Sequence, residues 1–328
     1  MTRIRIAFAV LLGTLLCPVI MPGPAWAADP YPSHPIQMIV PFPAGGPADI
    51  VGRLYALELS KLSGQPVVVE NVSGAAGIIG TQNAARTEPN GYTILFGTTS
   101  TIVINQVVMP KVPYDFQRDF TQVGLIANAP HILAIRSTLP ARTAPELIAM
   151  AKQEPGKLTF ASAGTGSIVQ MGGELFKYGA GIDIVHIPYK GGGPATMALL
   201  KDEVDMTVND LSTLKGNIES GKLRALAVAH TSRLKLLPDV PTFIELGLPQ
   251  IVSSTWWGIA VPVKTPEAIV LKLREYNDAI IRNPAYVTRL ADMAIDPIVL
   301  TPEQTQAFIA GEIDKWKGIA ARANIQVD

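Results

Sequence analysis

Short apolar stretches alternate along the chain with longer segments whose apolar residues recur every three or four positions. The first stretches predict strands at residues 36–40, 67–70 and 92–96, with helices at 48–62 and 78–86 between them. Strands that alternate with helices in this way are typical of parallel β-α-β units, whose right-handed crossovers place the strands in one sheet. The pattern therefore predicts an α/β fold.

A second series of the same kind begins after residue 130. Its predicted strands and helices alternate over 132–135, 145–153, 158–161, 167–178, 182–186, 194–200, 204–208 and 223–228. We interpret this series as a second sheet with a core of its own. Further on, the chain carries an apolar stretch at 256–260 and two long helical patterns, 266–282 and 302–321. A Thr-Pro pair precedes each of these two helices, which predicts a Thr N-cap followed by Pro at the first helical position.

The last two helices have no strands of their own, so we expect them to pack on the first series. This predicts two lobes, which suits 328 residues, a length too great for one average core. The expected division is a first lobe made of 28–127 and 253–328 and a second lobe made of 128–252. The two chain crossings, near 127 and 252, are then expected to act as a hinge.

The first 27 residues have the pattern of a cleavable export signal. Arg3 and Arg5 precede an apolar run over 6–21, and Ala25-Trp26-Ala27 forms an A-x-A cleavage site. We expect cleavage near Ala27 and an exported, soluble chain, because no later segment has the length needed to cross a bilayer. The only cysteine, Cys17, lies inside this segment, so we expect no disulfide in the mature protein.

The composition adds limits on the kind of partner. Hydrophobic residues make up 48% of the chain and charged residues 16%, which favours a well-buried core and argues against disorder. The predicted signal holds two of the 27 basic residues and none of the 27 acidic ones, so the mature balance is 25 − 27 = −2. No nucleic acid partner is expected from this balance.

Glycine-rich loops follow the predicted strands, at the edge where ligands bind in open α/β sheets. Each loop ends where a helix begins, so unpaired backbone N–H groups and the positive end of the helix dipole face the same space. Tight turns alone would explain any single loop, but five together favour a site for a small carboxylate. The five loops are Phe42–Gly46, Asn71–Gly77, Gly97–Ser100, Ser162–Ser167 and Pro188–Pro194.

Two charged residues in these regions have open alternatives. Asp49 either stabilises the start of its own helix or accepts a hydrogen bond from a ligand, and Lys190 is either a solvated loop residue or a charge contact for an acid. Trp256 and Trp257 are most simply interpreted as core and hinge residues.

The sequence contains no signature of a known catalytic or metal site. Gly164-Thr165-Gly166 has Val169 where a dinucleotide fingerprint needs a third small residue, and no phosphate loop, GxSxG or HExxH motif occurs. No metal-ligand spacing is found around the four histidines, which are His34, His131, His186 and His230. We expect no enzyme activity, cofactor or metal. An exported serine hydrolase using Ser162 or Ser167 stays open as an alternative, although no base follows from spacing.

Several longer motifs resemble those of a known family, the periplasmic solute-binding proteins of tripartite tricarboxylate transporters, or Bug-type receptors. In order, they are IVPFPAGGPADIVGRL, VENVSGAAGIIGTQNAARTEPNGYTILFG, SAGTGSIVQMGGELF, IVHIPYKGGGPATMALL, GKLRALAV and LPDVPTFIELG. The resemblance runs from about Tyr31 to the C-terminus. It implies a type II periplasmic binding protein-like fold, in which two doubly wound α/β lobes with a hinge close over a central ligand cleft.

The resemblance also implies a function and partners. It implies a periplasmic receptor, expected to be a monomer, that captures a dicarboxylate, tricarboxylate, aromatic acid or amino acid and delivers it to membrane permease subunits. A sensor component that binds the same acid is a second alternative.

The family's loop contacts match a set of residues in this chain. With Asp49, the predicted ligand-binding residues are Phe42, Pro43, Ala44, Gly45, Gly46, Thr99, Ser100, Ser162, Thr165, Gly166, Tyr189, Lys190, Gly191 and Asn209. The chain departs from the family at Gln170, where many members have His, and at Ser212, which follows Asn209-Asp210-Leu211 in place of Pro.

Overall fold

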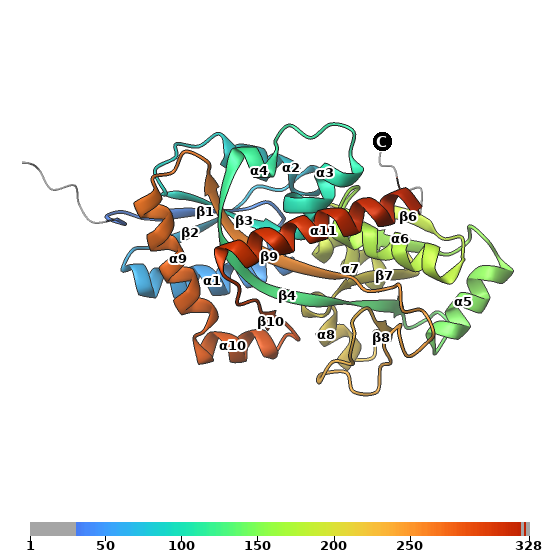
Figure 1. Ribbon diagram of the computed structural model, residues 1–328. Coiled ribbons are helices and arrows are strands. Elements are labelled where there is room, and N and C mark those ends of the chain that lie inside the picture. Colours follow the sequence, from blue (N-terminus) through green and yellow to red (C-terminus); the bar gives the residue numbers. More distant parts are fainter. Residues whose placement is uncertain (1–30, 323–324, 326–328) are drawn as a thin grey trace, which may run out of the picture. The chain divides into compact units, whose positions relative to one another are not determined.

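The computed structural model describes residues 31–322 and Ile325, so the predicted signal, residues 1–27, lies outside the described residues. From Pro32 onward, strands and helices alternate (Figure 1). The strands are β1 Ile36–Val40, β2 Val67–Asn71, β3 Thr93–Thr98, β4 Phe120–Arg136, β5 Thr159–Ser162, β6 Val185–Pro188, β7 Met206–Asp210, β8 Leu223–Val228, β9 Ser254–Pro262 and β10 Asp296–Pro297.

Most predicted helices are confirmed to within two residues at their starts and ends. The α-helices are α1 Pro47–Ser63, α2 Ile78–Ala85, α3 Asn105–Val108, α4 Phe116–Asp119, α5 Ala144–Gln153, α6 Ile168–Ala180, α7 Gly192–Leu200, α8 Leu211–Glu219, α9 Glu267–Ile281, α10 Pro284–Ala291 and α11 Pro302–Arg322. A 3₁₀ turn, Ala75–Gly77, precedes α2, and a π-helical turn, Ser100–Ile104, runs directly into α3. The sequence analysis did not predict α3, α4, α8, α10 or these two turns.

The strand β4 joins two groups of strands into one mixed sheet. Its first part pairs antiparallel with β9, and its last part, from His131, pairs antiparallel with β7 and β8. We call β1, β2, β3 and β9 the first half of the sheet, and β5, β6, β7 and β8 the second half. The strand order along the sheet is β2-β1-β3-β9-β4-β7-β5-β6. Only the outer pairs, β1 with β2 and β3 and β5 with β6 and β7, are parallel.

The prediction of a second sheet with its own core is only partly correct. A cluster that includes Ala161, Leu199 and Leu214 does belong to the second half alone. The sheet and the larger core, however, continue from one half into the other. One cluster of buried apolar side chains contains Leu95 and Trp256 of the first half and also Phe160 and Phe176 of the second. The physical reason is the length of β4, because a strand of 17 residues carries the sheet and its apolar surface from one half into the other. The sequence had predicted only its final segment, 132–135.

Two long strands, β4 and β9, lie side by side across this junction (Figure 1). Trp256 and Trp257 of β9 are 1% and 0% exposed, so both side chains are buried. Burial of two large aromatic side chains stabilises the strand pair through the apolar area removed from water.

The C-terminal helices pack on the first half of the sheet and on β4. The helix α9 contacts β4 and α1, and α11 contacts β4, α3 and the turn before it. At the start of α11, Thr301 Oγ1 accepts from the Gln304 amide and Gln304 Oε1 accepts from the Thr301 amide, so the predicted N-cap is confirmed. The same prediction at Thr265 is wrong, because its hydroxyl donates to Pro262 and α9 begins after Pro266.

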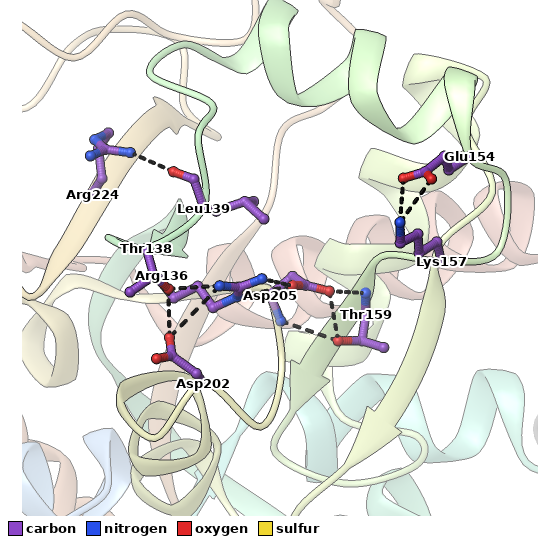
Figure 2. Close-up of polar contacts among 9 residues, drawn as sticks. All are labelled: Arg136, Thr138, Leu139, Glu154, Lys157, Thr159, Asp202, Asp205 and Arg224. Atoms are coloured by element: carbon purple, nitrogen blue, oxygen red, sulfur yellow. Dashed lines mark hydrogen bonds and ion pairs between the residues drawn. The ribbon is translucent and has the colours of Figure 1, made fainter.

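A polar cluster fixes the end of the second half where β5 and β7 begin (Figure 2). Asp205 Oδ1 accepts from Arg136 Nε and Nη2 at 3.0 and 2.9 Å, and Asp205 Oδ2 accepts from the Thr159 amide at 2.8 Å. These three residues belong to the end of β4 and the starts of β7 and β5. The cluster therefore holds three strands in register at the end away from the glycine-rich loops.

Candidate functional site

A cavity lies where strand ends from both halves meet the starts of three helices. The lining residues are Phe42, Pro43, Gly46, Pro47, Ala48, Thr98, Ser100, Ala163, Ile168, Val169, Gly192, Gly193, Pro194, Asn209, Asp210, Thr255 and Trp257. None of these lining residues in the described part of the chain is Lys, Arg or His. An anion in this cavity would have to be bound by neutral donors.

The first of these helix starts belongs to α1, which begins at the cavity with Pro47. Proline has no amide hydrogen, so Ala48, which lines the cavity, carries the first N–H of this helix. The residue before the helix, Gly46, makes no side-chain cap. The first amides of a helix have no acceptor within the helix, and its dipole places partial positive charge there.

The other two helix starts come from the second half of the sheet. In α6, the Ile168 amide donates to Ser100 Oγ of the first half at 3.0 Å, and Val169 follows it along the cavity wall. In α7, the first residues Gly192 and Gly193 line the cavity, and no side chain caps this helix. Three helix starts around one cavity can stabilise a bound carboxylate by about 0.3–1 kcal/mol each.

The loop before α1 is held in shape by Asp49. Its carboxylate accepts from the Gly45 amide at 2.9 Å and from Asn71 Nδ2 at 3.0 Å, and it pairs with Arg53 at 2.9 Å. Burial raises the pKa of Asp49, but the hydrogen bonds from Arg53, Gly45 and Asn71 together outweigh it, so the pKa lies below its ordinary value. The structure thus places Asp49 behind the loop, away from the cavity lining, where it supports the loop conformation.

The glycines of Gly191–Gly193 allow the two halves to touch. A Cβ at Gly191 would lie 2.8 Å from Pro43 Cδ, and one at Gly192 would lie 3.2 Å from Pro47 Cδ. Gly191 also has a φ of 125°, a backbone conformation that residues with a side chain rarely adopt. The close approach of the Gly191–Gly193 turn to the loop before α1 therefore requires residues without a side chain.

The predicted ligand-binding residues fall into three groups. Lining the cavity are Phe42, Pro43, Gly46, Ser100 and Asn209. A second, adjoining cavity is lined by Phe42 and Pro43 again and by Thr165, Tyr189 and Lys190, together with Gly74–Gly77, Met109, Ala163 and Gly164. Neither cavity is lined by Ala44, Gly45, Asp49, Thr99, Ser162, Gly166 or Gly191.

Several residues of the third group have internal partners. Thr99 Oγ1 accepts from the Trp256 amide at 2.7 Å, so Thr99 ties β3 to β9. The Gly166 amide donates to Gln170 Oε1 at 2.7 Å. The side chain of Gln170 therefore closes the loop Ser162–Ser167 against the start of α6.

The structure supplies a base for Ser162 that sequence spacing did not reveal. Ser162 Oγ lies 2.6 Å from His186 Nε2, and burial lowers the pKa of His186 to about 4. However, Ser162 is 0% exposed, lies outside both cavities, and its hydroxyl already accepts from the Gly164 amide. The pair links β5 to β6, and a buried serine so placed cannot reach a substrate.

Sequence analysis missed four polar residues that line the cavity: Thr98, Asp210, Thr255 and Trp257. Thr255 Oγ1 donates to Asp210 Oδ2 at 3.2 Å, and Asp210 is 1% exposed. Burial raises the pKa of Asp210 to about 7, an effect that the Thr255 hydrogen bond only partly offsets. The signal that could have identified Asp210 is its position directly after a strand, at the same edge as the glycine-rich loops.

Comparison with known proteins identifies the family of this chain. The family model described as "Tripartite tricarboxylate transporter family receptor" matches residues 51–325. Protein BugT of Bordetella pertussis is 38% identical over 323 residues, covering 97% of each chain. Rpa4515 of R. palustris with adipate is 32% identical with a TM-score of 0.88, covering 90% of this chain and 99% of its own. MatC of Rhodopseudomonas palustris with bound malate is 30% identical with a TM-score of 0.84, covering 88% and 99%.

A cavity formed by two halves of one sheet, with helix starts around it, in a chain similar to these receptors, identifies a solute-binding receptor. The type II periplasmic binding protein-like fold is likewise confirmed by these structures. The chain belongs to the tripartite tricarboxylate transporter receptor family, to which the Bug proteins it resembles also belong. The hydrolase and sensor alternatives find no support in these comparisons.

Within residues 31–322 and Ile325, no helix combines the length and the apolar character required to span a bilayer. The same part of the chain holds no group of three or more His, Cys, Asp or Glu residues placed to bind a metal ion.

Proposed function

We propose that this receptor is periplasmic and monomeric, that it binds a small organic carboxylate in the cavity between the two halves, and that it delivers this acid to membrane permease subunits. The observation that carries the proposal is the convergence of α1, α6 and α7 on a cavity without a cationic lining residue. Adipate and malate, named with two similar structures, are small carboxylates of the proposed kind.

The proposed ligand contacts are the predicted residues that line the cavity, Phe42, Pro43, Gly46, Ser100 and Asn209, with amides of the helix starts beside them. Thr165, Tyr189 and Lys190 line the adjoining cavity. These residues would contact a longer acid or lie at the entrance to the first cavity. The remaining predicted residues would act by holding the loops in shape.

We further propose that the halves are lobes that open and close around β4 and β9, with the division 28–127 and 253–328 against 128–252. Closure would bring the Gly191–Gly193 turn onto the loop before α1, the contact described above. A ligand that touches both lobes only in the closed state shifts the population toward closure by its differential affinity.

The direct test is calorimetry of residues 28–328 against succinate, adipate, malate, benzoate and glutamate, with matched amides and amines as controls. We expect at least one acid to bind with a micromolar Kd, about 8 kcal/mol of binding free energy, while its amide does not. Binding of the amides or amines in preference to every acid would contradict the proposal.

The proposed export signal has its own measurement. The full chain of 328 residues, produced in a bacterial host, should be recovered from the periplasmic fraction with Ala28 as its first residue. Recovery of the uncleaved chain from the cytoplasm would contradict this part of the proposal.

A further inference from the structure

Three buried polar atoms without a hydrogen-bond partner in the described chain belong to residues that line the same cavity. They are Thr98 Oγ1, Asp210 Oδ1 and Trp257 Nε1. Their residues are 2%, 1% and 0% exposed. A buried polar group without a partner costs free energy, so three of them around one cavity indicate that a ligand supplies the partners.

Strand register places the three side chains on one face of the sheet. Thr98 and Trp257 are directly opposed partners in the β3–β9 pair, so their side chains project from the same face. Thr255 lies two residues before Trp257 and therefore shares this face. Its hydroxyl donates to Asp210 Oδ2, which leaves Asp210 Oδ1 without a partner among residues 31–322 and Ile325.

Asp210 Oδ2 belongs to a hydrogen-bonded network of neutral side chains. Thr255 Oγ1 lies 2.9 Å from His131 Nε2, and His131 Nδ1 lies 2.9 Å from Ser253 Oγ. When Thr255 donates to Asp210, it accepts from His131 Nε2–H, and His131 Nδ1 accepts from Ser253. Oδ2 thus accepts from Thr255 of β9, and Oδ1 is the carboxyl oxygen without a partner in the described chain.

The hydrogen-bonding groups of Thr98, Asp210 and Trp257 determine which chemical group of a ligand can bind between them. The indole N–H of Trp257 can only donate, so the group it meets must accept, which excludes an ammonium at this position. The Thr98 hydroxyl can donate as well. A neutral Asp210 acid would add a third donor at Oδ1, and three donors suit the oxygens of a carboxylate.

The surroundings of Asp210 favour its neutral form. Burial raises its pKa to about 7, and the only opposing influences are the hydrogen bonds from Thr255 and from its own amide, with no charged side chain among them. The titratable group nearest along the network is His131 of β4, kept neutral because burial and Lys315 of α11 lower its pKa to about 3. The other neighbours, Asn209 of β7 and Ser253 and Thr255 of β9, do not titrate.

We propose that Thr98, Asp210 and Trp257 form a subsite for a second carboxylate of the ligand, with Asp210 in its acid form sharing its proton with a ligand oxygen. The proposal rests on the proposed function and narrows it to acids with two carboxylates, one at the helix starts and one at this subsite. Binding then takes up one proton wherever free Asp210 is ionised.

The first test measures affinity for adipate and hexanoate, a matched dicarboxylate and monocarboxylate, from about pH 6 to about pH 8.5. Dicarboxylate affinity should fall at least about tenfold over this range, because above pH 7 the empty receptor must gain a proton to bind. Calorimetry in buffers of different ionisation enthalpy should show uptake of close to one proton at about pH 8. An affinity that rises with pH, or one that does not change, would overturn the proposal.

The second test uses variants of the three residues. D210N keeps a donor but cannot titrate, so its adipate affinity should become independent of pH. T98V removes one donor with little change of volume, and W257F removes one donor together with part of the ring, so each should lower the adipate-to-hexanoate affinity ratio about tenfold. The matched control is W256F, because the Trp256 indole donates to Glu312 at 3.2 Å and lies outside the cavity lining. The adipate-to-hexanoate affinity ratio of W256F should equal that of the natural protein.

The outcomes separate the two proposals. If neither acid nor any other carboxylate binds, the proposed function itself fails. If carboxylates bind but T98V and W257F leave the ratio unchanged, only the second-carboxylate subsite is wrong.

Discussion

Asp210 and His131 have buried side chains whose pKa values move in opposite directions. Burial raises the pKa of Asp210 to about 7 from 3.8, and burial with Lys315 nearby lowers the pKa of His131 to about 3 from 6.5. Between about pH 4 and pH 6.5 the folded pair carries one proton, on Asp210, and the unfolded pair also carries one, on His131. Folding therefore changes no proton count in this pair over that range, and the two contributions to pH dependence cancel.

This cancellation predicts the behaviour of D210N. The variant loses the Asp210 contribution and keeps that of His131, whose unfolded form binds a proton below pH 6.5 while the folded form does not. Its free energy of unfolding should fall relative to the natural protein as pH drops below 6.5, by about 1.4 kcal/mol per pH unit.

Urea denaturation of both proteins at about pH 7.5, 6 and 5 measures the difference. His186 contributes equally to the pH dependence of both proteins, so its contribution cancels when their free energies of unfolding are subtracted. Parallel pH profiles for the two proteins would contradict the assignment of opposite shifts to Asp210 and His131.

Gly46 offers a second test at a single residue. Its backbone is extended, with φ −83° and ψ 170°, and a Cβ there would lie 3.4 Å from Pro43 O and 4.0 Å from the Gly193 amide nitrogen. Gly46→Ala should therefore bind acids within about threefold of the natural protein. Gly46→Val adds two methyl groups toward the cavity and the Gly191–Gly193 turn, and should lose at least about tenfold, or 1.4 kcal/mol, in calorimetry.

The two substitutions at Gly46 serve as mutual controls, because both remove glycine and only one extends beyond Cβ. Equal affinities for Gly46→Ala and Gly46→Val would mean that the loop before α1 is a turn without contact to the ligand.

At the scale of single residues, the sequence predicted the glycine-rich loops of the site but did not single out the polar lining residues Thr98, Asp210, Thr255 and Trp257. Phe42, Gly46 and Ser100 were identified from glycine-rich loops and a resemblance, and they do line the cavity. Thr98 lies inside the predicted loop Gly97–Ser100 but was not singled out, and Trp257 was assigned to the core, because a Trp in an apolar strand has the same appearance whether it faces core or ligand. Their role depends on the β3–β9 register, which pairs segments far apart in the sequence.

At the scale of elements, the strands and helices with regular spacing were predicted well, and those fixed by tertiary packing were missed. The segment 100–108 is rich in β-branched residues, which have low intrinsic helix propensity, yet it is helical because its apolar side chains are buried. The strand β4 contains Gly124, Asn128 and Pro130, which interrupt the apolar pattern, and it forms because β9 and β7 pair with it.

The turn before α7 gives a prediction at this scale. In Gly191→Ala the new Cβ would clash with Pro43, so contact between the turn and the loop before α1 should weaken and acid affinity should fall at least about tenfold, or 1.4 kcal/mol. The matched control is Gly221→Ala, which also has a positive φ, 72°, but has open space around its Cβ. Both variants should lose about 1–3 kcal/mol of stability from backbone strain, and only Gly191→Ala should lose affinity. Equal affinity in both would remove the turn from the site.

The polar cluster of Figure 2 gives a second prediction for the elements. Asp205→Ala removes the acceptor shared by β4, β5 and β7, and should lower the free energy of unfolding by about 2–3 kcal/mol. Glu154→Ala breaks only the exposed pair with Lys157, whose side chains are 59% and 64% exposed, and should change it by less than about 0.5 kcal/mol. Urea denaturation measures both, and a loss for Asp205→Ala no larger than that of the control would contradict the role of this cluster.

For the molecule as a whole, sequence reasoning predicted an α/β receptor correctly but divided it too sharply. The pattern suggested separate sheets, and the structure has one sheet continued by β4. The proposed movement of the two halves would centre on β4, which continues from its pairing with β9 into its pairing with β7 and β8. Two strands can twist together while the paired halves keep their internal hydrogen bonds.

The central claim is that an organic acid binds between the halves, held by main-chain amides at the starts of α1, α6 and α7. A crystal structure of residues 28–328 with the best-binding acid tests it most directly. The account predicts one carboxylate within hydrogen-bond distance of amides among Ala48, Val169 and Gly193, with Trp257 at the opposite end of the ligand. An acid bound outside this cavity, or one whose carboxylate has no main-chain amide within hydrogen-bond distance, would contradict it.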